Sequence, residues 1–300
     1  MKTLGRLLTA MITPFDAAGE VNVGEAVRIA QFLVERGNDG VVIAGSTGEG
    51  NALDTEEKLA LFAAVKQGLG SKGTVIAGTG GPNTRQSVQL TKQAEGCGVD
   101  AVLITVPAYV KPTQDGMLLH FGSIAEATAL PILVYNIPGR TAANMLPATF
   151  AELTRRHPNI IGIKESTGDL NAFSTILRER TRADVTFWCG DDNMYLPSLA
   201  VGGYGLVSVA GHLCGRELRA MADAFDAGDV DTAARIHRDL LPLMLGLFTI
   251  TSPIPVKWAM GTYGFDVGPC RSPLGAMPEA LKATLEPLIA PYRPVRSAAG

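Results

Sequence analysis

The sequence of 300 residues lacks long apolar runs and clusters of one charge. No segment approaches the roughly 20 uninterrupted apolar residues of a membrane span. An early apolar run at residues 7–12 is soon interrupted by Pro14 and Asp16, so it does not form a signal-peptide core. The 26 basic and 29 acidic residues are scattered and give a net charge of -3, with no basic stretch that would follow phosphates. We therefore expect a cytoplasmic protein that binds neither membranes nor nucleic acid.

Cysteine and histidine are scarce and dispersed. The chain has 4 of each, with no C-x-x-C pair and no His and Cys residues at metal-ligand spacing. These residues are Cys97, Cys189, Cys214, Cys270, His120, His157, His212 and His237. The thiols are typical of a reduced intracellular protein. We expect no metal and no organic cofactor, which disfavours a metal-dependent aldolase.

Short apolar runs alternate with longer segments of helical periodicity along most of the chain. Each run is almost continuously apolar, as in parallel strands that are covered on both faces. The eight runs are residues 7–12, 41–44, 74–77, 101–105, 132–135, 160–163, 185–188 and 206–209. With 46% apolar residues and 34 glycines, the chain can bury a large core and make many tight turns.

Helical patterns lie between and after these runs. Residues 25–36 are amphipathic, and the segment Thr55–Leu69 is preceded by Asp54 with Glu57 at the position of a capping box. Eight strand-helix units without a composition break predict an α/β fold, a (β/α)8 barrel, over residues 1–226. A helical extension packed on the barrel is expected over residues 227–300. An open doubly wound sheet is the alternative.

Lys164 is the first candidate for chemistry. It directly follows the apolar run 160–163, which places it at the end of a buried strand, and barrel enzymes carry their chemistry at the carboxyl ends of the strands. Burial disfavours a charged ammonium, and a neutral amine is a nucleophile for a carbonyl. The alternative is a lysine whose stem packs while its head reaches solvent.

Other polar residues follow neighbouring runs. Tyr135 ends one run, and its phenol could carry protons. Ser46 and Thr47 lie between glycines, where hydroxyls and backbone N–H groups can hold a carboxylate. Arg140 follows a Pro-Gly turn and could bind a carboxylate in a bidentate manner. Taken singly, these residues are also explained as a core tyrosine, a favourable turn and a surface arginine.

Taken together, these motifs resemble those of one family. The carriers of the resemblance are Gly45-Ser46-Thr47-Gly48-Glu49, Ala77-Gly78-Thr79-Gly80, Tyr109 with Lys111-Pro112, Tyr135-Asn136-Ile137-Pro138-Gly139-Arg140-Thr141, Ile161-Gly162-Ile163-Lys164-Glu165, Gly190-Asp191-Asp192 and Pro253-Ile254-Pro255-Val256-Lys257. In order and spacing they are similar to those of the dihydrodipicolinate synthase and N-acetylneuraminate lyase superfamily, from about Leu7 to Leu274. The resemblance implies a barrel lyase that forms a Schiff base with pyruvate.

The resemblance also implies roles for individual residues. Lys164 would form the Schiff base, and Tyr135 would donate and accept protons. A hydroxyl relay would run from Tyr135 through Thr47 to Tyr109 of a neighbouring subunit, which implies a homo-oligomer, often a dimer of dimers. Ser46, a further candidate catalytic residue, stands where synthases usually have threonine and keeps a hydroxyl, so the relay survives.

Substrate binding is implied in the same way. Thr47, the Val207 main chain and Gly190 would hold the pyruvate carboxylate or shape its pocket. Arg140 favours the synthase branch, which condenses pyruvate with aspartate semialdehyde to 4-hydroxy-tetrahydrodipicolinate in lysine and diaminopimelate biosynthesis. The alternatives are another pyruvate-dependent aldolase, such as a lyase of N-acetylneuraminate, 2-keto-3-deoxy sugar acids or hydroxy-oxoglutarate, and a catalytically silent barrel that binds a small molecule.

Three positions bear on regulation. Lysine-inhibited synthases tend to carry a glutamate, a tyrosine and an asparagine where this sequence has Gln86, Ala108 and Pro82. The resemblance therefore implies that free lysine inhibits this protein weakly or not at all, which initial-rate assays with millimolar lysine test.

Overall fold

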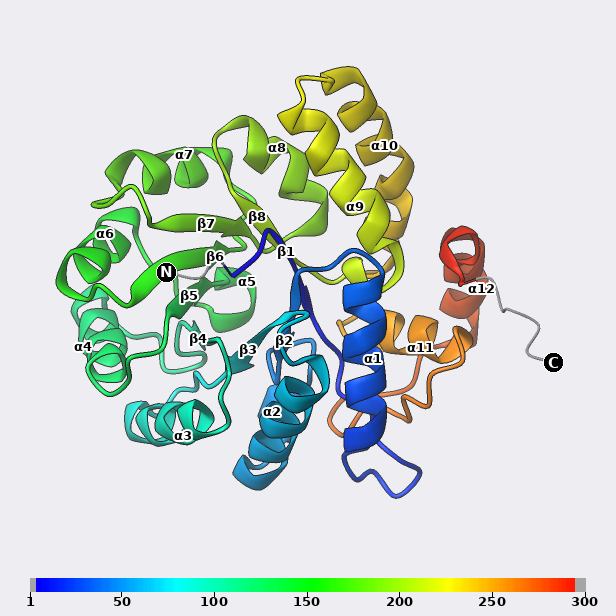
Figure 1. Ribbon diagram of the computed structural model, residues 1–300, viewed down its shortest axis with the longest axis horizontal. Helices are drawn as coiled ribbons and strands as arrows, with labels where there is room; N and C mark the ends of the chain where they lie inside the picture. Colours follow the sequence, from blue (N-terminus) through cyan, green and yellow to red (C-terminus); the bar gives the residue numbers. More distant parts are fainter. Residues whose placement is uncertain (1–3, 295–300) are drawn as a thin grey trace.

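The computed structural model describes residues 4–294 and contains a closed barrel of parallel strands surrounded by helices (Figure 1). The strands follow one another around the barrel in chain order, and β8 pairs with β1 to close it. The strands are β1 (Leu7–Ala10), β2 (Gly40–Ile43), β3 (Thr74–Gly78), β4 (Ala101–Thr105), β5 (Ile132–Asn136), β6 (Ile160–Glu165), β7 (Thr186–Cys189) and β8 (Gly205–Ser208). The predicted (β/α)8 barrel is confirmed, and the open-sheet alternative is wrong.

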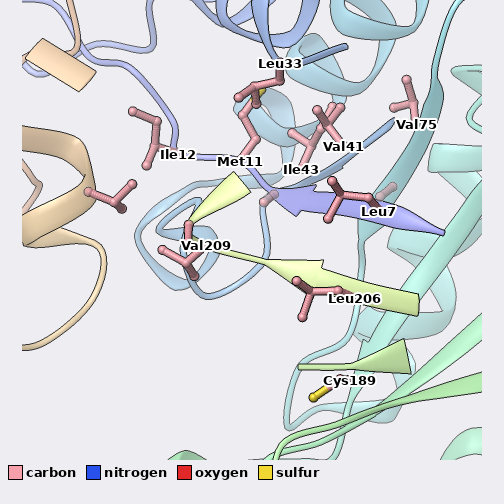
Figure 2. Packing of buried hydrophobic residues seen from close by; sticks show 14 of the residues in the cluster. Leu7, Met11, Ile12, Leu33, Val41, Ile43, Val75, Cys189, Leu206 and Val209 are labelled. Carbon is pink, nitrogen blue, oxygen red and sulfur yellow. The ribbon is translucent and has the colours of Figure 1, made fainter. Parts of the chain in front are cut away.

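The apolar runs form strands because both of their faces are buried. Along β2, Val41 and Ile43 belong to the large cluster between strands and helices, while Val42 belongs to a smaller cluster inside the barrel. Side chains alternate between the two faces of a strand, so both clusters need apolar residues and the run becomes continuous. Figure 2 shows part of the outer cluster, where Leu7 and Leu206 lie on the paired strands β1 and β8.

Helices follow the strands and cover the outside of the barrel. The capping box at the start of α2 is present, because the Asp54 and Glu57 side chains each accept a hydrogen bond from the other's backbone N–H. The helices are α1 (Val23–Glu35), α2 (Thr55–Leu69), α3 (Thr84–Gly96), α4 (Gln114–Ala125), α6 (Pro147–Arg156), α7 (Leu170–Glu179), α8 (Tyr195–Ala200) and α9 (Gly211–Asp226), with the single turn α5 (Pro138–Thr141) after β5.

Within the described residues, three more α-helices follow the barrel, drawn from yellow to red in Figure 1: α10 (Val230–Gly246), α11 (Ile254–Thr262) and α12 (Glu279–Ile289). α10 packs on α9 and α12, and α11 packs on both α9 and α12. The helical extension is therefore present. The division of the chain at residues 226 and 227 stays a prediction, and residues 295–300 lie outside the described part. Within residues 4–294, no helix combines the length and the apolar character that crossing a membrane requires.

Candidate functional site

The centre of the site is a lysine and a tyrosine on neighbouring strands. Tyr135 of β5 and Lys164 of β6 are register partners, and each is 5% exposed. The Lys164 Nζ atom lies 4.0 Å from the centre of the Tyr135 ring. β6 continues to Glu165, so Lys164 is the penultimate residue of the strand rather than the expected last one. The strand therefore fixes the backbone on both sides of the lysine.

These two side chains belong to the inside of the barrel. Tyr135 and Val207 are members of the inner apolar cluster, as is Trp188, which is the register partner of Lys164 on β7. Paired residues on adjacent parallel strands point to the same face of the sheet. The Lys164 side chain therefore lies beside aromatic and aliphatic groups, with the Asp191 carboxyl near enough to interact with its charge. It makes no ion pair with any carboxylate of residues 4–294.

Gly190 lies directly after β7 and against the Lys164 stem. A Cβ atom at this position would lie 1.9 Å from Ser166 Oγ and 3.0 Å from Lys164 Cε. Any side chain would therefore displace the lysine or the serine. The structure brings Gly190 against Lys164, while its expected role in the pyruvate pocket stays a prediction.

The turn after β2 carries the hydroxyl candidates. Ser46 is exposed, whereas Thr47 is buried. The turn is anchored from below because the Thr13 hydroxyl donates a 2.6 Å hydrogen bond to the Gly48 carbonyl. A Cβ at Gly48 would lie 2.9 Å from the Met11 carbonyl oxygen, so only glycine permits this close approach.

A cavity of about 670 Å³ opens at the carboxyl ends of the strands. Loops after β2, β3, β4 and β5 line it together with residues 251–252 and 271–274 of the helical extension. Ser46, Tyr109 and Arg140 are among its lining residues, whereas Lys164, Tyr135, Thr47, Val207 and Gly190 are not. Thr105 joins the two groups, because it lines the cavity and is the register partner of Tyr135.

Tyr109 and Arg140 stand at the rim of this cavity. Tyr109 is 93% exposed and adopts a left-handed backbone conformation with φ of 73°. Its reach into a neighbouring subunit stays a prediction. Arg140, in α5, is exposed and donates a 3.4 Å hydrogen bond to the Ser252 carbonyl of the extension. Its guanidinium is thus held beside the cavity by a contact that leaves other donors available.

Two carboxyl groups next to Lys164 have altered proton affinities. Burial raises the pKa of Asp191, and the positive charge of Lys164 opposes this rise. Burial also raises the pKa of Glu165 to about 7, against hydrogen bonds from Asn136 Nδ2 at 3.0 Å and from the Thr167 N–H at 2.9 Å. The neighbourhood of Lys164 therefore holds carboxyl groups that bind protons more readily than exposed ones.

Sequence reasoning did not assign roles to several buried polar residues. Asp192 accepts hydrogen bonds from the Ser208 hydroxyl and from the N–H groups of Val209 and Ala210, and so fixes the turn after β8. Glu49 and Lys257 form a buried ion pair at 2.7 Å. Asp192, Glu49 and Lys257 all lie inside motifs that carried the resemblance. Their place in these motifs indicated that they matter, but it did not indicate which residues they contact.

The fold is a closed parallel barrel, and a buried lysine lies at the carboxyl end of one of its strands. These two features place the chain in the class of (β/α)8-barrel proteins whose site is built from inner strand residues and the loops that follow the strands. Residues 3–291 match the family model described as the dihydrodipicolinate synthetase family. The chain belongs to that family.

Relatives and solved structures agree with this assignment. The 4-hydroxy-tetrahydrodipicolinate synthase of Dehalococcoides mccartyi is 46% identical over 292 residues, which are 97% of this chain and 98% of the relative. The crystal structure of a dihydrodipicolinate synthase from Bacillus anthracis has a TM-score of 0.94 at 39% identity and covers 97% of this chain and 99% of its own. A chloride-inhibited synthase from Acinetobacter baumannii, solved in complex with pyruvate, has a TM-score of 0.91 at 31% identity, with 96% and 98% covered.

Proposed function

We propose that this protein is a lyase with the 4-hydroxy-tetrahydrodipicolinate synthase activity for which its relatives are named, and that it forms its product from pyruvate and aspartate semialdehyde through a Schiff base on Lys164. Near-complete coverage of these relatives favours synthase activity over the other pyruvate-dependent aldolases and over a silent barrel.

The observation that carries the proposal is the pairing of Lys164 with Tyr135. The amine lies over the phenol ring at 4.0 Å, inside the barrel and without an ion-pair partner in residues 4–294. An amine that a carboxylate does not hold can lose its proton and attack a carbonyl carbon. The adjacent phenol is within reach to move protons on and off the atoms that react.

The first half-reaction builds the nucleophile. The Lys164 Nζ lone pair attacks C2 of pyruvate, and Tyr135 relays a proton from Nζ to the former carbonyl oxygen to give a neutral carbinolamine. Tyr135 delivers a further proton to this oxygen, water leaves, and an iminium forms between Nζ and C2. The Tyr135 phenolate left by this step takes a proton from C3, and the iminium accepts the electrons of the C3–H bond, which yields an enamine.

The second half-reaction joins the two substrates. C3 of the enamine attacks the aldehyde carbon of aspartate semialdehyde, the new alkoxide is protonated, and the iminium at C2 is restored. The amino group of the semialdehyde then attacks C2 and closes the ring. A proton passes from this nitrogen to Nζ, the C2–Nζ bond breaks, and Lys164 leaves as C2 forms a double bond to the ring nitrogen. Arg140 binds the semialdehyde carboxylate at the cavity rim, which aligns the aldehyde with the enamine.

The remaining predicted residues bind pyruvate or complete the relay. Thr47, the Val207 main chain and Gly190 surround the pyruvate carboxylate, with Ser46 beside them. Tyr109 completes the hydroxyl relay in the site of a second copy of the chain, so the active form is at least a dimer. Its high exposure in a single chain is consistent with burial by a partner. We place this small-molecule enzyme in the cytoplasm.

Borohydride trapping tests the proposal. Incubation with pyruvate and borohydride reduces an iminium to a stable secondary amine, and peptide mass spectrometry locates it. We expect the adduct on Lys164. Lys257 is a matched internal control, because it is also buried but is paired with Glu49. Absence of an adduct on Lys164, or equal labelling of Lys257, contradicts the proposal.

A further inference from the structure

A buried ion pair connects the helical extension to the turn that carries Ser46 and Thr47. Glu49 Oε1 lies 2.7 Å from Lys257 Nζ, and the two side chains are 1% and 2% exposed. Glu49 ends the turn after β2, whereas Lys257 lies in α11, 208 residues further along the chain. Two charges are buried at a cost that only good geometry and further hydrogen bonds offset. The pair therefore fixes one arrangement of these two distant segments.

The extension holds the carboxylate of Glu49 through both of its oxygens. Oε2 accepts a 2.8 Å hydrogen bond from the backbone N–H of Arg271, while Oε1 is bound by Lys257. The Arg271 guanidinium donates to the Ala52 carbonyl at 2.8 Å and ion-pairs with Glu57. The helical extension therefore binds the turn at Glu49 and, three residues later, at Ala52.

An aromatic ring completes this network. Lys257 Nζ lies 4.1 Å from the centre of the Phe15 ring, and the Arg271 guanidinium lies 4.4 Å from the same centre. Phe15 belongs to the loop after β1 and is fully buried. Both cations therefore have a second contact that holds them in place beside Glu49.

The turn needs an external support because its own conformation is unfavourable. Glu49 has φ 53° and ψ 32°, the left-handed region that residues with a Cβ rarely occupy. Within the turn, the Glu49 N–H donates to the Ser46 carbonyl at 3.2 Å, and the Gly50 N–H donates to the Gly45 carbonyl at 3.0 Å. Strained residues of this kind persist where the surroundings hold them. Here the surroundings are the ion pair with Lys257 and the hydrogen bond from the Arg271 N–H.

We propose that Glu49 and Lys257 are positioning residues for the Ser46–Thr47 turn, so that the helical extension sets the affinity of the site for pyruvate. Neither residue touches the substrate in this scheme. The inference rests on the proposed function, in which the turn holds the pyruvate carboxylate. It differs from a purely structural role, in which the pair only attaches α11 to the barrel.

Two variants test this proposal. Glu49→Gln keeps the size of the side chain and leaves Lys257 free to lose its proton, while Glu49→Gln/Lys257→Met removes both charges and leaves no unpaired one. The measurements are kcat, the KM values of both substrates, and the rate of the borohydride-trapped adduct on Lys164. We expect the KM for pyruvate to rise about tenfold or more, because small displacements of binding groups have large effects. The KM for the aldehyde should change by less than about twofold, since Arg140 is held by Ser252 instead.

Lys66→Met is the matched control. Lys66 Nζ and Asp100 Oδ2 form an ion pair at the same 2.7 Å distance, between the end of α2 and the start of β4 and away from the turn. We expect this variant to lower the melting temperature and to leave the KM for pyruvate unchanged.

The outcomes separate the two proposals. An adduct on Lys164 of the unaltered protein, with a KM for pyruvate that Glu49→Gln and the double variant leave unchanged, overturns this inference alone. An equal rise in the KM for pyruvate in Lys66→Met also overturns it, because loss of stability then explains the effect. Absence of the adduct in the unaltered protein overturns both proposals.

Discussion

Two seams of the barrel bury polar side chains at the same rim and satisfy them differently. Where β7, β8 and β1 lie side by side, the Asp192 carboxylate, which follows β7, accepts hydrogen bonds from Ser208, Val209 and Ala210 at the end of β8. At the seam between β5 and β6, Lys164 lies over an aromatic ring and makes no ion pair with residues 4–294. Buried polar groups are normally satisfied within the protein, so a group left without such a partner is the one available to a substrate.

His212 illustrates the satisfied seam. Its Nε2 accepts a 3.1 Å hydrogen bond from the Ile12 N–H, which requires this nitrogen to carry no proton. Its Nδ1 lies 2.8 Å from the Val209 carbonyl oxygen and donates to it. The neutral ring thus ties the segment after β8 to the segment after β1, and both nitrogens are used. Burial alone therefore does not mark a catalytic group.

Replacing the Lys164 amine, between β5 and β6, should have the largest effect on activity. Lys164→Met removes the nucleophile and should lower kcat/KM by roughly 10⁴-fold or more, because the covalent route is lost. The melting temperature should stay the same or rise, since an apolar side chain of similar length fills the site. Steady-state kinetics and thermal unfolding measure the two effects. Retained activity would show that Lys164 is not the nucleophile, and the contrast between Lys164 and Asp192 would then have no functional meaning.

Removing the Asp192 carboxylate should lower the free energy of unfolding instead. Asp192→Ala leaves the buried N–H groups of Val209 and Ala210 without their acceptor, which should lower the free energy of unfolding by about 4 kcal/mol. Urea unfolding measures this loss. A variant as stable as the unaltered protein would show that the seam does not depend on this carboxylate.

The pH dependence of stability should expose His212. Burial lowers the pKa of His212 to about 4, below its ordinary value near 6.5. The unfolded state therefore binds a proton at His212 more readily than the folded state does. The stability that the neutral, buried His212 contributes is fully present above about pH 6.5 and is lost as the pH falls toward 4. The linkage amounts to about 3 kcal/mol. Urea unfolding between pH 7 and pH 4, compared with His212→Gln, isolates this residue. Identical pH profiles would contradict the assignment.

The smallest effect is expected at the cavity rim. Arg140→Ala should raise the KM for aspartate semialdehyde by about 10- to 100-fold, because a charge-assisted contact to its carboxylate is lost. The rate of pyruvate trapping on Lys164 should not change, since Arg140 lies in α5, above the strands. Assays with each substrate varied in turn separate these effects. An unchanged KM for the aldehyde would show that Arg140 does not bind the substrate carboxylate.

The sequence predicted the barrel because its strands are short continuous apolar runs, and this pattern follows directly from burial on both faces. It also predicted the end of β6 as the place of Lys164, with an error of one residue. The helical extension after the barrel was predicted as well, because α10 carries an amphipathic pattern. Proximity in the chain is enough for these features, because hydrophobic periodicity is a local property.

The tertiary structure decided which residues meet. Tyr135 and Lys164 are partners because β5 and β6 pair in one particular register. Glu49 meets Lys257 because α11 packs close to the turn after β2, and no local pattern encodes a contact across 208 residues. Such contacts depend on the whole packing of the chain, in which each buried charge must find its partner. The sequence alone determined the architecture and the candidates, and the fold determined which of them are held by partners and which remain free to react.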